Sequence, residues 1–160
     1  MHLKQFVFVD ESGMNREHRR AYARSKRGVR VYEKVSGKRV RRTNIVGGLV
    51  YDRTATRHIA VQCYDHSTTA TFFEDWFEFE LIPAMPENSI VIMDNASFHR
   101  KQVLYGIAAR YGIGLLFLPP YSPELNPIEH SWANFKRWMA YNTKKFSNFQ
   151  ISVDYYFENA

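Results

Sequence analysis

Short apolar runs bounded by turn residues recur along this chain, and they predict strands. Five such runs are rich in valine, isoleucine and phenylalanine, and they cover residues 5–10, 43–51, 57–64, 89–94 and 114–118. The first three follow one another with no helical segment between them, and Asp52-Arg-Thr supplies a turn signal between the second and third. We therefore expect an antiparallel three-stranded meander followed by strands that alternate with helices.

Three other segments repeat apolar residues every three or four positions, which is typical of helices with one buried face. In residues 69–81 the apolar face consists of Phe73, Trp76, Phe77 and Leu81. The acidic residues expected off that face are Glu74, Asp75 and Glu78. In residues 99–111 the inward-facing residues are Val103, Leu104, Ile107 and Tyr111. The helix that follows Asn126 carries the stripe Ile128, Trp132, Phe135 and Met139, which should pack on the sheet.

The resulting order, β-β-β-α-β-α-β-α, is typical of the ribonuclease-H-like α/β fold, a mixed five-stranded sheet with flanking helices. We expect residues 1–160 to form a single domain, with a basic insertion at 14–42 between the first two strands. The C-terminal tail, 143–160, is either a short helix that closes the core or a frayed end. In this order the ends of the first and fourth strands lie side by side.

Composition supports one compact globular domain, because 160 residues with 45% hydrophobic and 16% aromatic content argue against disorder. The first residues do not read as a signal peptide, and no apolar run approaches the roughly 18 residues of a membrane span. We therefore expect a cytoplasmic protein with no membrane partner. Cys63 is the only cysteine, which excludes an intramolecular disulfide and a multi-cysteine zinc site.

Positive charge is concentrated in one segment of the chain. The net charge is +6, yet residues 14–42 hold twelve basic and two acidic residues. Such a run is often only a solvated face, but twelve basic residues beside a candidate metal site, formed by Asp10, Asp94 and Glu129, favour contact with DNA phosphates. The candidates for that contact are Arg24, Lys26, Arg27, Arg30, Lys38, Arg39, Arg41 and Arg42.

Two carboxylates stand at the ends of strands that we expect to be neighbours. Asp10 ends the first run and Asp94 ends the fourth, and Glu129 lies near the start of the last helix. Carboxylate oxygens suit Mg²⁺, and like charges this close repel one another unless a cation lies between them. Two metal ions can act on both the attacking and the leaving oxygen of a phosphodiester, so the pattern indicates a nuclease or a DNA strand transferase.

Glu129 has a second explanation. Asn126 is a good N-cap and Pro127 suits the first helical position, so Glu129 could reach back to the Asn126 amide as in a capping box. The residues alone leave these alternatives equal. Glu11 follows Asp10 directly, and because successive strand residues point to opposite faces, we expect it to be structural and not a ligand.

Three stretches resemble the catalytic domain of DDE transposases of the mariner type and their bacterial insertion-sequence relatives. They are Phe8-Val-Asp-Glu-Ser-Gly, Ile92-Met-Asp-Asn-Ala-Ser-Phe-His and Leu118-Pro-Pro-Tyr-Ser-Pro-Glu-Leu-Asn-Pro-Ile-Glu-His-Ser-Trp. The resemblance runs from about Phe6 to Met139, and its third stretch is very specific. It implies a ribonuclease-H-like fold. It also implies that Asp10, Asp94 and Glu129 are the catalytic, metal-binding carboxylates, because the 34 residues between Asp94 and Glu129 match the mariner-type spacing.

The same resemblance implies supporting roles for Asn95 and His99, with His99 orienting a phosphate or a carboxylate. Asn126 borders the site and is a further supporting candidate. The resemblance also implies metal-dependent cleavage of DNA at transposon ends and strand transfer, with two Mg²⁺ or Mn²⁺ ions. It further implies a homodimer, a separate or fused helix-turn-helix module that binds the ends, and a bacterial cytoplasmic protein that is nucleoid-associated when on DNA. Two alternatives remain open: a ribonuclease-H-like nuclease without strand transfer, and a catalytically silent DNA-binding remnant.

Overall fold

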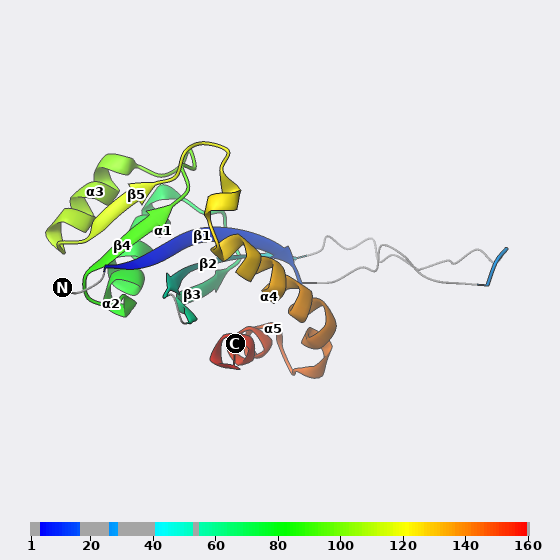
Figure 1. The fold of residues 1–160 in the computed structure, drawn as a ribbon. Coiled ribbons are helices and arrows are strands. Elements are labelled where there is room, and N and C mark those ends of the chain that lie inside the picture. The colour runs from blue at the N-terminus through cyan, green and yellow to red at the C-terminus, as the bar shows by residue number, and fades with distance from the viewer. Residues whose placement is uncertain (1–3, 17–25, 29–40, 53–54, 160) are drawn as a thin grey trace.

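The computed structural model describes residues 4–16, 26–28, 41–52 and 55–159 of the chain. One mixed sheet lies at its centre, with the strand order β3-β2-β1-β4-β5 (Figure 1). Its strands are β1 (Gln5–Asn15), β2 (Arg42–Tyr51), β3 (Thr56–Tyr64), β4 (Ser89–Met93) and β5 (Gly114–Phe117). The strand β2 is antiparallel to β1 and β3, whereas β4 is parallel to β1 and β5. The predicted meander and the mixed five-stranded sheet are confirmed.

Helical segments cover both faces of this sheet. The first group is α1 (Ala70–Trp76), the π-helix η1 (Phe77–Leu81), α2 (Ile82–Ala84) and α3 (Lys101–Arg110). The second group is the 3₁₀ turn η2 (Pro123–Leu125), α4 (Ile128–Asn142), η3 (Thr143–Lys145) and α5 (Phe149–Asn159). Figure 1 shows α4 and α5 together beside the strands β1 to β3. Among the described helices, none is long and apolar enough to cross a membrane.

Two clusters of buried side chains fix the helices on the sheet. The first joins α1, η1 and α3 to the face of β1 and β4 that carries Val7, Val9 and Val91. The second joins α4 and α5 to Ile45 and Leu49 of β2. The predicted buried stripes are confirmed for Phe73, Trp76, Phe77 and Leu81, and for Ile128, Trp132, Phe135 and Met139. Neighbouring residues of one strand therefore pack against helices on opposite faces of the sheet.

Some sequence predictions about the helices were wrong. Val103 and Tyr111 were expected to face inward, but both are exposed, because α3 contacts the sheet through Leu104 and Ile107. Glu74 was expected on the polar face of its helix and is buried instead. Its burial is possible because Arg100 donates two hydrogen bonds to its carboxylate, one of them 2.7 Å long from Nε to Oε1.

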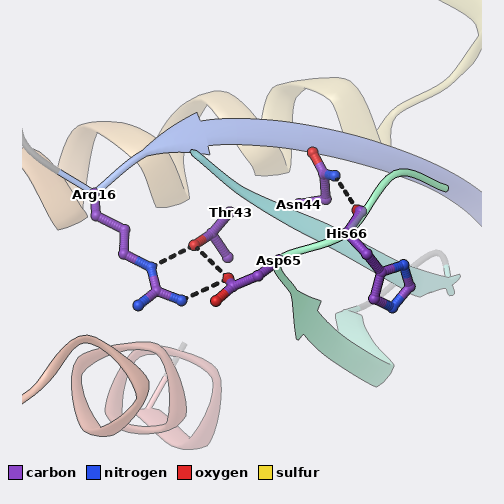
Figure 2. Close-up of polar contacts among 5 residues, drawn as sticks. All are labelled: Arg16, Thr43, Asn44, Asp65 and His66. Carbon is purple, nitrogen blue, oxygen red and sulfur yellow. Dashed lines mark hydrogen bonds and ion pairs between the residues drawn. The ribbon is translucent and has the colours of Figure 1, made fainter. Parts of the chain in front are cut away.

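Strand β1 extends five residues beyond the predicted end at Asp10, and it pairs with β2 as far as Asn15 opposite Arg42. Both ends of the predicted 14–42 insertion are therefore strand residues. Figure 2 shows how Arg16, next to this end, donates to Thr43 and to Asp65, both at 2.6 Å. The guanidinium also lies 5.0 Å from the Phe149 ring centre, which links the strand pair to α5.

The C-terminal tail resolves the alternative left open by its sequence. Residues 149–159 form α5, and Val153 and Ser152 are buried in its contact with the rest of the domain. Aromatic contacts hold it to α4, including the ring pair Phe135–Phe157 with centres 4.9 Å apart. The tail is thus a helix that closes the second core cluster.

Candidate metal centre

Asp10 lies at the middle of the sheet, opposite Gly47 of β2 and one residue beyond the Val9–Met93 pair that joins β1 to β4. It is 7% exposed. Burial, followed by the negative charges of Glu129 and Asp94, raises the pKa of Asp10 to about 8. A buried aspartate whose charged form is this unfavourable is a candidate for cation binding.

Asp94 directly follows β4, and two donors hold one of its carboxylate oxygens. The Ala96 amide donates to Oδ1 at 3.1 Å, and His99 Nε2 lies 3.3 Å from the same oxygen. The hydrogen bond from His99 is the main cause that lowers the pKa of Asp94, although burial opposes it. Asp94 is therefore charged at neutral pH, whereas the nearby Asp10 holds its proton more firmly.

Glu129 lies in the first turn of α4 and is exposed. The start of α4 has no side-chain cap, so the capping-box explanation of Glu129 is not borne out. Asn126 instead directs its side chain toward the sheet, where Nδ2 donates to the Val9 carbonyl at 3.4 Å. Because Val9 precedes Asp10, this bond fixes the start of α4 next to the strand that carries Asp10.

A proline-rich connection completes the surroundings. The Leu118 amide donates to the Met93 carbonyl at 2.8 Å, so the connection leaves β5 beside the end of β4. It forms one wall of an open pocket of about 410 Å³, which is also lined by Asp94, Asn95, Asn126 and Glu129. Tyr121, with a positive φ of 58°, is fully exposed at this wall. Asn95 is exposed to the pocket as well.

One residue of this region was missed by sequence reasoning. Glu11 does point to the opposite face from Asp10, as strand alternation requires, but there its Oε1 lies 3.8 Å from His99 Nε2. Burial and the charges of Asp10 and Asp94 raise the pKa of Glu11 well above its usual range. The signal available in the sequence was the parallel pairing of the first and fourth strands, which places Glu11 beside the segment that follows Asp94.

The predicted DNA-contacting residues divide into two sets. Lys26, Arg27, Arg41 and Arg42 belong to the described chain, and all four are exposed. The predictions for Arg24, Arg30, Lys38 and Arg39 fall outside the described residues. The described basic residues 41 and 42 lie at the start of β2, at the end of the β1–β2 pair that is remote from Phe6 and Tyr51.

The donor set fits a hard divalent cation. Asp10 is influenced directly by the charges of Asp94 and Glu129, and the last two line one pocket. Carboxylate oxygens are hard ligands, and a cation would offset the cost of ionising the buried Asp10. Glu11, Asp94 and His99 form a second group, whose nearest donor atoms all lie within 4.8 Å of one another.

A sheet with the order β3-β2-β1-β4-β5, with Asp10 in the central strand β1 and Asp94 directly after the neighbouring strand β4, defines a ribonuclease-H-like α/β domain. Within that class, a family model described as DDE superfamily endonuclease matches residues 5–150. The chain therefore belongs to the DDE superfamily endonucleases. The family predicted from the three sequence stretches is confirmed. No curated protein matches the chain significantly.

Solved structures of the Mos1 transposase share this fold. A strand transfer complex of Mos1 superposes with a TM-score of 0.72 at 18% identity, over 96% of this chain and 45% of that one. A mariner Mos1 paired-end complex with Mg gives 0.69 at 18% identity, over 96% and 48%. The catalytic domain of the Mos1 mariner transposase gives 0.60 at 16% identity, over 97% and 70%. The predicted ribonuclease-H-like fold is confirmed, and the chain spans about half the length of the transposase in those complexes.

Proposed function

We propose that this chain is the catalytic domain of a transposase, which cleaves DNA at transposon ends and joins the freed 3′ end to new DNA. Asp10, Asp94 and Glu129 hold the divalent metal ions that this chemistry uses, two of Mg²⁺ or Mn²⁺. Membership of the DDE superfamily endonucleases supports the proposal. So does the fold, which is shared with Mos1 structures described as strand transfer and paired-end complexes.

The observation that carries the proposal is the environment of Asp10. Its carboxyl is buried beside two other acidic residues, and its pKa is raised to about 8. Fold stability gives no reason to keep three acidic groups together there, because each raises the cost of ionising the next. A divalent cation bound to these oxygens supplies Lewis-acid activation of the attacking oxygen and neutralises charge on the phosphate.

The residues around the carboxylates have distinct parts in the proposal. Asp10 and Asp94 come from adjacent strands, which form a rigid base, whereas Glu129 comes from α4 and completes the ligand set. Asn126 holds α4 against the Val9 carbonyl and so keeps Glu129 near the sheet. Asn95, exposed in the pocket, is placed to contact a DNA phosphate. The exposed basic residues Lys26, Arg27, Arg41 and Arg42 contribute phosphate contacts further away.

The first test is metal binding, which does not depend on knowing the transposon ends. We expect Mn²⁺ to bind the chain in isothermal titration calorimetry with two sites. Asp94→Asn should weaken binding at least about tenfold, because it removes a charged ligand. It should also abolish Mn²⁺-dependent nicking of a supercoiled plasmid. Asp75→Asn serves as the matched control, because Asp75 is an exposed residue of α1 that does not line the pocket at Asp94 and Glu129.

The outcomes separate the candidates. A chain that binds no Mn²⁺ at millimolar concentration, or an Asp94→Asn variant that nicks as well as the wild type, contradicts the proposed metal centre. Product analysis then distinguishes a transposase from a nuclease without strand transfer, because only a transposase joins the liberated 3′ end to another DNA. Binding of DNA without any nicking supports the silent DNA-binding remnant instead.

The partners follow from the same proposal. The chain acts on DNA, as a homodimer, and together with a helix-turn-helix module that is fused or separate and recognises the ends. A complex with DNA can be assembled with and without such a module, and its mass measured by sedimentation equilibrium. A complex that holds two copies of the chain supports the dimer, and one that holds a single copy contradicts it.

A further inference from the structure

We propose that Asn126 supplies a further, uncharged ligand to the metal centre, with its side-chain carbonyl oxygen Oδ1 binding one of the ions. This inference rests on the proposed function, since it adds a ligand to the centre formed by Asp10, Asp94 and Glu129. It goes beyond the part already given to Asn126, which is to hold the start of α4 against the sheet.

The side chain of Asn126 is buried beside the acidic residues. Asn126 is 3% exposed, and it lines the same pocket of about 410 Å³ as Asp94 and Glu129. Its Oδ1 is buried and has no hydrogen-bond partner among the described residues. A buried carbonyl without a partner is unfavourable, because it has lost its hydrogen bonds to water. A cation bound to Oδ1 would remove this disadvantage.

The amide group of Asn126 is held in one orientation. Its Nδ2 donates to the Val9 carbonyl at 3.4 Å. A backbone carbonyl can only accept, so the amide nitrogen has to face it and Oδ1 has to point away from it. Val9 immediately precedes Asp10. The amide is therefore fixed beside the part of β1 that carries the buried carboxylate.

Backbone hydrogen bonds hold Asn126 on both sides. Its amide donates to the Pro123 carbonyl at 2.9 Å, and its carbonyl accepts from the Glu129 amide at 3.1 Å. The second bond joins Asn126 to the proposed ligand at the start of α4, so a single turn of the chain positions both side chains. A ligand that is fixed before the ion arrives loses little conformational freedom on binding, which favours affinity.

An amide oxygen suits this centre better than another carboxylate would. Carbonyl oxygens are hard ligands that Mg²⁺ and Mn²⁺ accept. Because the amide is neutral, it adds a ligand without adding to the repulsion among Asp10, Asp94 and Glu129. The hydrogen bond from Nδ2 to Val9 also polarises the amide and makes Oδ1 a stronger acceptor. The two ends of one side chain thus have different partners, the sheet for the nitrogen and the metal for the oxygen.

A serine and a cysteine substitution at position 126 test direct binding. Asn126→Ser and Asn126→Cys give side chains of similar size, and both lose the hydrogen bond to Val9, so they differ mainly in oxygen against sulfur. Sulfur ligands favour soft Cd²⁺ over Mn²⁺. We expect Asn126→Ser to bind Mn²⁺ about tenfold more weakly than the wild type in calorimetry. The ratio of Cd²⁺ to Mn²⁺ affinity should be at least about tenfold higher in Asn126→Cys than in Asn126→Ser.

A purely structural role predicts a different result. If Asn126 only anchors α4, the two variants bind each metal equally well, because both lack the anchor. An equal ratio of Cd²⁺ to Mn²⁺ affinity in the two variants therefore overturns the inference. Ser122→Cys is the matched control, because Ser122 lines the same pocket. A ratio raised as far in this control as in Asn126→Cys would mean that any thiol in the pocket captures Cd²⁺, and it too overturns the inference.

A measurement on the wild-type chain keeps the test valid if thermal melts show that the variants at position 126 do not fold. Asparagine labelled with ¹³C at its side-chain carbonyl is incorporated, and electron-nuclear double resonance of bound Mn²⁺ is recorded. Direct binding predicts a strong ¹³C coupling that persists in Asn95→Ser, since Asn95 also lines the pocket. Loss of the coupling in Asn95→Ser overturns the inference. If the wild type binds no Mn²⁺, the proposed function fails. If it binds Mn²⁺ without the coupling, only this inference fails.

Discussion

Asp10 shows at the scale of one residue how a proposed metal ligand opposes stability. A buried carboxyl between Asp94 and Glu129 is unfavourable when ionised, and its pKa is raised to about 8. In the unfolded chain the same group ionises near its ordinary value of 3.8. Between these two values the folded state holds a proton that the unfolded state has lost. The contribution of Asp10 to stability is therefore fully present below about pH 4 and is lost as the pH rises toward 8.

The substitution Asp10→Asn removes this pH dependence. Without divalent metal, we expect the variant to melt near the wild-type temperature at pH 4 and several degrees above it at pH 7.5. The physical reason is that each pH unit in this window costs the wild type up to about 1.4 kcal/mol. Added Mn²⁺ should raise the melting temperature of the wild type but not that of Asp10→Asn. Thermal melts at both pH values measure the effect, with Asp75→Asn as the control.

Equal differences in melting temperature between Asp10→Asn and the wild type at pH 4 and pH 7.5 would contradict the raised pKa of Asp10.

The residue scale also shows what sequence reasoning could and could not find. Asp10 and Asp94 were identifiable because each directly follows an apolar run. The pairing of the first and fourth strands could have placed Glu11 near the segment after Asp94, but its contact with His99 depends on how the buried histidine ring packs against Phe73 and Phe98.

At the scale of elements, the position of α4 relative to β1 decides where Glu129 lies. Trp132 follows Glu129 by one helical turn and packs over Gly47 of β2, the residue paired with Asp10. A Cβ atom at Gly47 would lie 3.0 Å from Trp132 Cη2 and 3.1 Å from Val61 Cγ2. Gly47 thus allows the helix to approach the sheet at the strand pair that carries Asp10.

We expect Gly47→Ala to push Trp132 outward and displace the first turn of α4. Overpacking of this kind costs about 1–3 kcal/mol, and the shift of Glu129 should also weaken Mn²⁺ binding. Gly106→Ala is a matched control with the opposite expected sign, because it lies inside α3 with nothing within 4 Å of the added atom. It should stabilise the protein by about 0.5–1 kcal/mol. Urea unfolding of both variants gives the comparison, and a Gly47→Ala variant as stable as the wild type would rule out the proposed packing role.

Elements differed in how well the sequence predicted them. Apolar periodicity located the buried face of α4, because its stripe is unbroken from Ile128 to Met139. It misjudged β1, because the predicted strand ended at Asp10 and left out Glu11, Ser12 and Gly13. Those residues are nevertheless in a strand, because β2 pairs with them as far as Arg42. Where β1 ends is decided by its pairing with β2, and local strand propensity does not reveal that pairing.

At the scale of the whole molecule, charge is divided between two regions. The chain carries a net charge of +6, and the segment 14–42 contains twelve of its 22 lysine and arginine residues. The proposed metal centre is acidic instead, with the charges of Asp94 and Glu129 acting on Asp10. A polyanion is therefore attracted by one part of the surface and repelled by the metal centre until cations bind there. DNA affinity and metal affinity should consequently be separable by mutation.

This separation leads to a prediction about salt dependence. The triple variant Arg27→Gln, Arg41→Gln and Arg42→Gln removes three exposed positive charges from the basic segment. Removal of each cation that binds a phosphate should reduce the slope of log affinity against log salt by about 0.9. We expect weaker binding to any duplex, a slope smaller by up to about 2.7, and unchanged Mn²⁺ affinity. Fluorescence anisotropy with a labelled duplex at several salt concentrations measures the DNA affinity and its slope, and calorimetry measures the Mn²⁺ affinity.

The control for this prediction is Arg137→Gln with Lys144→Gln and Lys145→Gln, which removes the same charge from α4 and η3. If DNA responded only to the net charge of the molecule, both triple variants would change the slope equally. A larger effect of the first variant assigns phosphate contacts to the β1–β2 end of the domain. An equal effect would mean that the basic segment is only a solvated face and makes no particular contact with DNA phosphates.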